Sequence, residues 1–89
     1  TPSWRFTRTP EEALQDPHCA WLWRGEGPAT AGPAIHLSSQ PRAYAQGLYA
    51  ALYELDNLGR QRLLIQSPAD TPDWAAVLDR LARASQLLA

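Results

Sequence analysis

The segment 41–67 constrains the fold most, because it predicts a long helix, the end of that helix and a buried strand in direct succession. Gly59 is expected to end the helix, since glycine accepts the left-handed conformation common after a last helical turn. The run 63–65 is apolar without alternation, which is typical of a strand covered on both faces. The helical face is defined by apolar residues at i, i+4, i+7, i+8 and i+11, namely Tyr44, Leu48, Ala51, Leu52 and Leu55.

The remaining residues predict three more strands and two more helices. Alternating large apolar and polar residues indicate a strand over 4–8, and apolar runs indicate strands over 19–23 and 34–38. The Thr-Pro pairs at 9–10 and 71–72 are typical of helix starts. The predicted order of elements is therefore β-α-β-β-α-β-α.

This order predicts an α/β fold, a small three-layer Rossmann-like sandwich with a mostly parallel sheet of about four strands and helices on both faces. The second and third strands are joined by the glycine- and proline-rich loop 25–33 and not by a helix. They can pair antiparallel, or the loop can cross over, and the pattern leaves both arrangements open.

Length and composition indicate one small domain over residues 1–89. The chain starts with Thr1 and not Met, so we expect a fragment of a longer chain or a processed one. A formal net charge of -1 with no basic segment argues against a direct nucleic-acid partner. The single cysteine fits a reducing compartment, and neither a membrane span nor a signal peptide is visible. These features predict a cytoplasmic protein with no membrane partner.

No set of residues converges on catalytic or metal chemistry. The loop 25–30 departs from a dinucleotide-binding fingerprint, because Thr30 stands where a third glycine is needed and a strand follows instead of a helix. His18, Cys19 and His36 are too few and too poorly spaced for a zinc site. Cys19 with His36 is a weak candidate for a nucleophilic pair. We therefore predict no catalytic residue, no metal ligand and no cofactor in this domain.

Two sets of candidate site residues remain. Tyr49 and Tyr53 flank the apolar helical face at i, i+4, either as core edge or as an interface patch for another domain. Asp56 joins them, since an acid near a helix C-terminus opposes the dipole and needs a compensating donor. The second set lies at the expected carboxyl ends of strands, where open α/β sheets bind ligands. It consists of Ser38, Ser39, Ser67 and Asp70.

The sequence of residues 44–56, Y-A-x-x-L-Y-A-A-L-Y-E-L-D, resembles the C-terminal domain of the long, two-domain form of threonylcarbamoyl-AMP synthase. The strand at 59–65 and the W-A-A-V-L-D-R-L helix at 74–81 extend the resemblance over residues 35–83. Two departures stand out. Tyr53 occupies a position where that family often has Arg, and the turn Gln66-Ser67-Pro68 replaces a Glu-x-Pro turn.

The resemblance implies a non-catalytic, Rossmann-like accessory domain that packs on or gates the N-terminal catalytic domain of the same chain. That catalytic domain is an ATP-dependent nucleotidyltransferase, which joins threonine, bicarbonate and ATP for threonylcarbamoyladenosine modification of tRNA. The alternative is a small nucleotide- or ligand-binding module that takes ATP or AMP at the carboxyl ends of the strands. A stand-alone enzyme is the least favoured reading.

Overall fold

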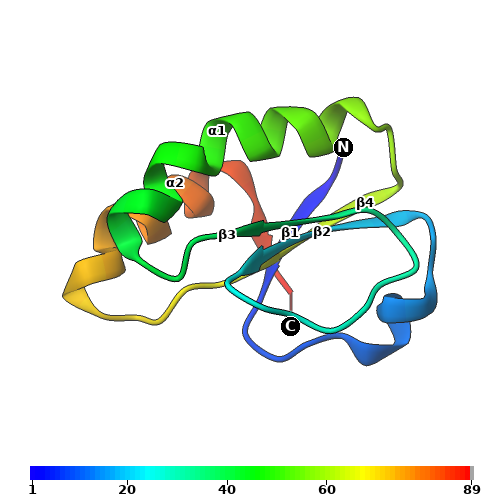
Figure 1. Ribbon diagram of the computed structural model, residues 1–89, viewed down its shortest axis with the longest axis horizontal. Helices are drawn as coiled ribbons and strands as arrows, with labels where there is room; N and C mark the ends of the chain where they lie inside the picture. The colour runs from blue at the N-terminus through cyan, green and yellow to red at the C-terminus, as the bar shows by residue number, and fades with distance from the viewer. Residues whose placement is uncertain (89) are drawn as a thin grey trace.

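A parallel β-sheet runs through the centre of the molecule, and each of its two sides is covered by other segments of the chain (Figure 1). In the computed structural model, which describes residues 1–88, five strands pair in the order β3-β2-β4-β1-β5. Every pairing between them is parallel. The strands are β1 (Ser3–Phe6), β2 (Cys19–Arg24), β3 (Ala34–Leu37), β4 (Arg62–Gln66) and β5 (Gln86–Leu87).

The connecting helices follow the predicted order. They are the 3-10 helix η1 (Glu11–Gln15), the long helix α1 (Pro41–Asn57), the 3-10 helix η2 (Pro72–Trp74) and α2 (Ala75–Ala84). The α/β prediction is confirmed, and the arrangement is compatible with a Rossmann-like sandwich. The sheet has one strand more than the predicted four, because the two-residue β5 pairs with β1 after α2. Its two exposed residues, Gln86 and Leu87, are too few to give a strand pattern in the sequence.

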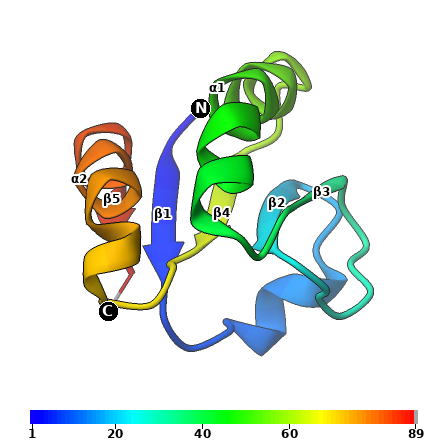
Figure 2. The same cartoon turned by 60° about the vertical axis from the view of Figure 1, so that its left-hand side comes forward.

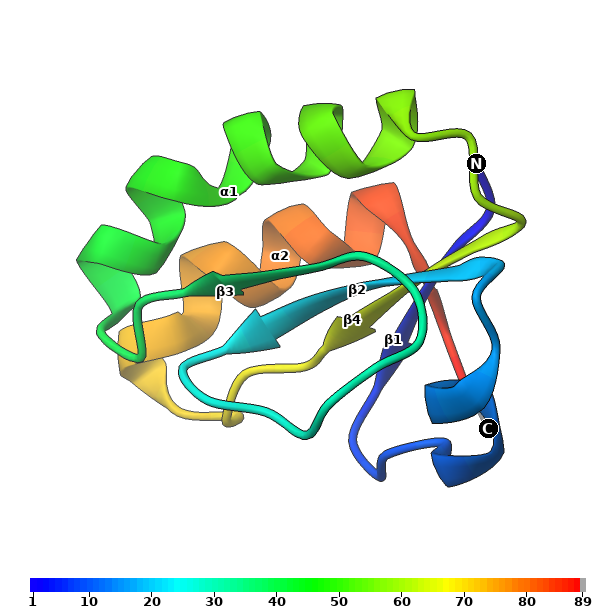
Figure 3. The same ribbon diagram turned by 45° about the vertical axis from the view of Figure 1, so that its right-hand side comes forward.

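Both α-helices cover one side of the sheet, which we call the helical face (Figure 3). Strands β2 and β4 contribute Ala20, Leu22, Leu63 and Ile65 to this side. From above, the helices contribute Tyr44, Leu48, Ala51, Leu55, Trp74, Val77 and Leu81. The apolar positions predicted for α1 thus form the core of this face, with Leu52 packed at its edge.

The opposite side, which we call the loop face, is covered by η1 and the loop 25–33 (Figure 3). Its core is aromatic: Trp21 and Trp23 stack with centroids 5.2 Å apart, and Phe6 meets both rings edge-on. A helix is present on this side too, but it is a single short 3-10 segment. Asp16-Pro17 stops it, as the sequence indicates.

The loop 25–33 decides the question that the sequence left open, since it crosses over and returns the chain to a parallel strand. Trp21 to Arg24 pair in register with Ala34 to Leu37. The crossing requires close approach to the sheet. A Cβ on Gly32 would lie 1.8 Å from the carbonyl oxygen of Cys19, and one on Gly27 would lie 2.5 Å from the Trp23 ring.

Helix α1 ends at the predicted glycine. Gly59 has φ +66, which is the left-handed conformation expected of a glycine that ends a helix. The residue that precedes α1 is Gln40, whose backbone amide donates to Ser38 Oγ at 3.0 Å. The strand 63–65 is buried on both faces, with each side chain 2% exposed or less. These features confirm the helix, its end and the buried strand that the segment 41–67 predicts.

Candidate functional site

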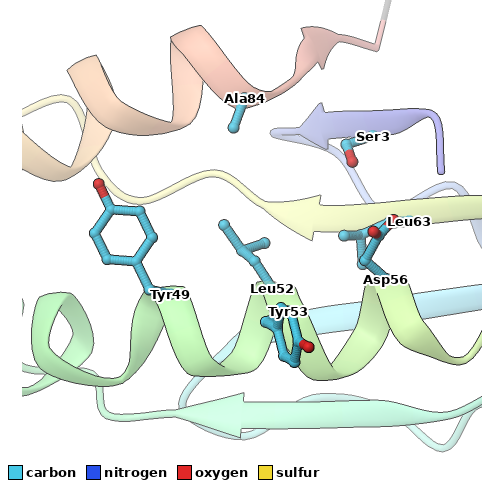
Figure 4. Close-up of a pocket in the computed structure, with 7 residues that line it drawn as sticks. All are labelled: Ser3, Tyr49, Leu52, Tyr53, Asp56, Leu63 and Ala84. Carbon is cyan, nitrogen blue, oxygen red and sulfur yellow. The ribbon is translucent and has the colours of Figure 1, made fainter.

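The interface candidates of α1 lie together along a groove between the two α-helices. The groove has a volume of about 450 Å³, and Ser3 and Leu63 of the sheet lie beside it (Figure 4). Tyr49, Tyr53 and Asp56 line it from α1, with Leu52 between them, and Ala84 lines it from α2. Ser3 and Leu63 form the first pair between β1 and β4, so the groove lies at the amino ends of these strands.

The two tyrosines of this groove are exposed and only one of them is held by a neighbour. Tyr49 is 63% exposed and Tyr53 is 72% exposed. The Arg80 guanidinium of α2 lies over the Tyr49 ring, 4.7 Å from its centroid, which is a cation–π arrangement. In Figure 4 Tyr49 points from α1 across the groove towards α2. The groove therefore presents two large aromatic surfaces on a rigid helix.

Asp56 has a compensating donor, as its unfavourable place at a helix end predicts. The amino nitrogen of Thr1 lies 3.0 Å from Asp56 Oδ1. Thr1 lies just before β1 and 55 residues from Asp56 in the chain, so sequence spacing could not identify this partner.

The ligand-binding candidates at the carboxyl ends of the strands lie in two separate places. Ser38 follows β3 and lines a hollow of about 470 Å³ with Gly25, Glu26, Gly27, His36 and Leu37. Ser39 is exposed and lies outside that lining. Ser67 and Asp70 follow β4 and line a different crevice, of about 630 Å³. The structure therefore pairs Ser67 with Asp70 but does not bring all four residues to one site.

The crevice beside Ser67 and Asp70, which we call the switch crevice, contains two arginines that the sequence reading missed. Arg5 of β1 and Arg24 of β2 both line it, together with residues of the β4–η2 connection, α2 and β5. For Arg24 the sequence contains a signal. Arg24 continues the series Ala20, Leu22 on the helical face, so a charged residue falls where the strand points inward.

The contacts of Arg24 hold its side chain against the core. Its guanidinium lies over the Trp74 ring, 5.2 Å from the centroid, and its backbone amide donates to Gln66 Oε1 at 2.8 Å. Trp74 in turn meets Tyr44 edge-on, with centroids 5.2 Å apart. Burial raises the pKa of Tyr44 to about 12, and the charge of Arg24 opposes that rise.

Cys19 and His36 do not form a nucleophilic pair. Cys19 is fully buried at the start of β2, opposite Arg62, whereas His36 pairs with Trp23 four positions further along the same strand. Arg62 donates to Cys19 Sγ at 3.4 Å, and burial raises the pKa of the Cys19 thiol. His36 Nδ1 lies 2.9 Å from the Gly25 carbonyl oxygen, which fixes the imidazole on the loop. Both side chains thus have structural partners.

A search of residues 1–88 for metal-binding groups finds no three His, Cys, Asp or Glu side chains gathered around one point. Within the same residues, no helix has the length and apolarity needed to cross a membrane.

Comparison with known protein families gives one match, and it covers nearly the whole chain. The model described as "Threonylcarbamoyl-AMP synthase, C-terminal domain" matches residues 5–86 of the 89. No curated protein and no solved structure matches the chain. The match includes the N-terminal strand, η1 and β2, which lie before the segment 35–83 that carries the resemblance in the sequence.

Proposed function

The chain belongs to the family of threonylcarbamoyl-AMP synthase C-terminal domains, and on that premise we propose that it is a non-catalytic accessory domain that packs on or gates the catalytic domain of such a synthase. In this role it acts in the cytoplasm, in the threonylcarbamoyladenosine modification of tRNA. The nucleotidyl transfer itself belongs to the catalytic domain of the same protein.

The observation that carries this proposal is the pair of exposed tyrosines beside the groove between α1 and α2. Tyrosine is enriched at protein interfaces, because it buries a large rigid area at low conformational cost and keeps a polar end for hydrogen bonding. Tyr49 and Tyr53 are two of the four large hydrophobic side chains exposed among residues 1–88. Both lie on α1, one helical turn apart.

The position of the groove suits a domain that regulates the catalytic domain as well as one that only binds it. Its lining comes from α1, α2 and the amino ends of β1 and β4. A partner seated there would contact both helices at once, and its docking would be sensitive to the spacing between them. Arg80 and Asp56 provide one charge of each sign near the tyrosines, so a polar rim surrounds the aromatic surface.

The proposal is tested by adding the unlabelled catalytic domain of the synthase to the isotope-labelled chain and following its amide NMR signals. We expect shifts in the segments 49–56 and 80–84, which border the groove. Shifts confined to η1 and the loop 25–33, or no shifts in a folded sample, would contradict docking at α1.

A matched pair of variants makes the test residue-specific. Tyr53→Ser should weaken the complex about tenfold or more, since a central interface aromatic contributes roughly 2 kcal/mol. Leu87→Ser removes a side chain of similar exposure, 60%, from the edge strand β5 outside the groove, and should leave the affinity unchanged. Equal losses in both variants would point to a general loss of stability and not to a tyrosine contact.

A further inference from the structure

The switch crevice lies where the chain leaves two neighbouring strands towards opposite faces of the sheet. β1 and β4 are adjacent and parallel. After β1 the chain passes to η1 on the loop face, and after β4 it passes to η2 and α2 on the helical face (Figure 2). In open α/β sheets this divergence opens a crevice at the carboxyl ends of the strands, and ligands bind there.

Two buried guanidinium nitrogens without partners lie at this point. Arg5 Nε and Arg24 Nε are inaccessible to solvent, and neither has a hydrogen-bond partner among residues 1–88. Neither arginine takes part in an ion pair within the same residues. A buried donor without a partner costs free energy, and the cost is greater for a charged group. Both arginines line the crevice, so an anion bound there would supply the charge partner that neither has among residues 1–88.

From these observations we propose that the switch crevice binds the phosphate group of a small phosphorylated ligand that also carries hydroxyl groups, with Arg5 and Arg24 as the phosphate ligands. Two guanidinium groups match the charge of a phosphate dianion and offer it several N–H donors in a fixed geometry. Arg24 is already oriented by its stacking on Trp74.

The acidic residues of the crevice indicate which chemical groups the ligand carries besides its phosphate. Asp79 is engaged by Arg83, whose Nη2 lies 2.9 Å from Asp79 Oδ2. Asp70 is exposed at the rim beside Ser67 and has no cationic partner among residues 1–88. A carboxylate there repels a bare anion but accepts hydrogen bonds from hydroxyl groups. A sugar or nucleoside phosphate provides both kinds of group.

The size of the crevice suits such a ligand. Its volume of about 630 Å³ lies within the range typical of small-molecule sites, roughly 300–1,000 Å³. It also lies at the opposite end of β1 and β4 from the tyrosine groove, so the two sites share no lining residue. The phosphate site therefore goes beyond the docking function and does not depend on it.

The test is calorimetric titration of the 89-residue chain with AMP, ribose 5-phosphate, inorganic phosphate and adenosine. We expect AMP and ribose 5-phosphate to bind, inorganic phosphate to bind more weakly, and adenosine to give no heat. Equal binding of inorganic phosphate and the two esters would assign the site to the free anion and overturn the hydroxyl half of the proposal. No heat from any of the four, in a folded sample, would overturn the proposal entirely.

Charge-removing variants identify the residues. Arg5→Gln and Arg24→Gln should each weaken AMP binding about tenfold or more, because each removes a charge-assisted hydrogen bond to the phosphate. Arg60→Gln makes the same change at an exposed arginine in the turn after α1, and its affinity should stay within about twofold of the original, given the screening of exposed charges. Equal weakening by all three variants would overturn the assignment.

Since Arg24→Gln also removes the contact with Trp74, a measurement without mutation is needed beside it. The Nε–Hε NMR signals of Arg5 and Arg24 should shift during a titration of the unmodified chain with ribose 5-phosphate, while those of Arg60 and Arg83 stay in place. Shifts at Arg60 and Arg83 with none at Arg5 and Arg24 would place the phosphate elsewhere and contradict the proposal. A failed docking experiment at α1 would leave either result unaffected.

Discussion

The two faces of the sheet are equally buried but are covered in different ways. The helical face lies under α1 and α2, which have 17 and 10 residues, and its core is largely aliphatic. The loop face lies under a five-residue 3-10 helix and a loop, and its core is built on Trp21, Trp23 and Phe6. Large aromatic side chains thus supply buried volume where regular structure does not.

The difference extends to the candidate sites. The tyrosine groove and the switch crevice both take part of their lining from α2, on the helical face. Straight helices meet a twisted sheet along limited lines, so gaps open beside them. An irregular loop can follow the side chains beneath it, as Gly27 follows Trp23. We therefore expect the tyrosine groove and the switch crevice, both beside α2, to carry function and the aromatic core of the loop face to serve stability.

Paired core truncations give the largest expected effect and test whether the two faces are equally part of the fold. Trp21→Ala on the loop face should lower the free energy of unfolding by about 3–5 kcal/mol, and Leu48→Ala on the helical face by about 2–5 kcal/mol. Both side chains are fully buried. Urea unfolding followed by circular dichroism measures both. A loss below about 1 kcal/mol for Trp21→Ala would mean that the loop face folds separately from the core.

The packing of the loop 25–33 on β2 can be disrupted without removing any aromatic ring. Gly32→Ala places a Cβ 1.8 Å from the backbone carbonyl oxygen of Cys19, so the loop must lift from β2. The expected loss is about 3 kcal/mol, at the top of the usual range for overpacking, measured by thermal unfolding. The control is Gly59→Ala, which meets no atom within 4 Å but has φ +66. It should cost only about 1 kcal/mol from backbone strain. Equal losses would indicate strain and not a clash.

The smallest expected effect appears only at high pH and belongs to the helical face. The pKa of Tyr44 is raised to about 12 from an ordinary value of 10.0, because the neutral phenol is favoured in the core. The folded state therefore binds the proton more tightly than the unfolded state. This contribution, roughly 2–3 kcal/mol, is complete below about pH 10 and is lost as the pH rises to about 12.

Tyr44→Phe removes the ionisable hydroxyl. The comparison of this variant with the original chain at neutral pH is the control, because Tyr44 is not ionised there. Its hydroxyl has no hydrogen-bond partner among residues 1–88, so the variant should match or slightly exceed the original stability at pH 7. Between about pH 10 and 12 the original chain should lose stability faster than the variant, as measured by denaturant unfolding at each pH. Parallel losses in both chains would show that another group controls alkaline unfolding.

Much of the fold was predictable because its signals are local. The apolar face of α1, the glycine after it and the two-sided burial of β4 follow from periodicity and from the conformational freedom of one residue. The interface candidates Tyr49, Tyr53 and Asp56 were predicted from the same helix, and the structure brings them to one groove because they lie on one face. Docking of a partner at that groove stays a prediction.

The ligand candidates show where such prediction stops. Ser38, Ser39, Ser67 and Asp70 were chosen because they follow strands, but which strand ends share a crevice depends on the strand order. The order β3-β2-β4-β1-β5 places the end of β4 beside that of β1 and separates it from that of β3 by β2. Arg5 and Arg24, which are 19 residues apart in the chain, line the crevice for the same reason.

The sequence by itself determined the α/β class, the long helix with its glycine end and the resemblance to the synthase domain, because these depend on residues close together in the chain. Only the tertiary structure decided the parallel return of β3 through the loop 25–33 and the placement of Arg5 and Arg24 in one crevice. Each of these depends on pairing between distant segments, and the free energy of such pairing comes from packing against the whole sheet and not from any local pattern.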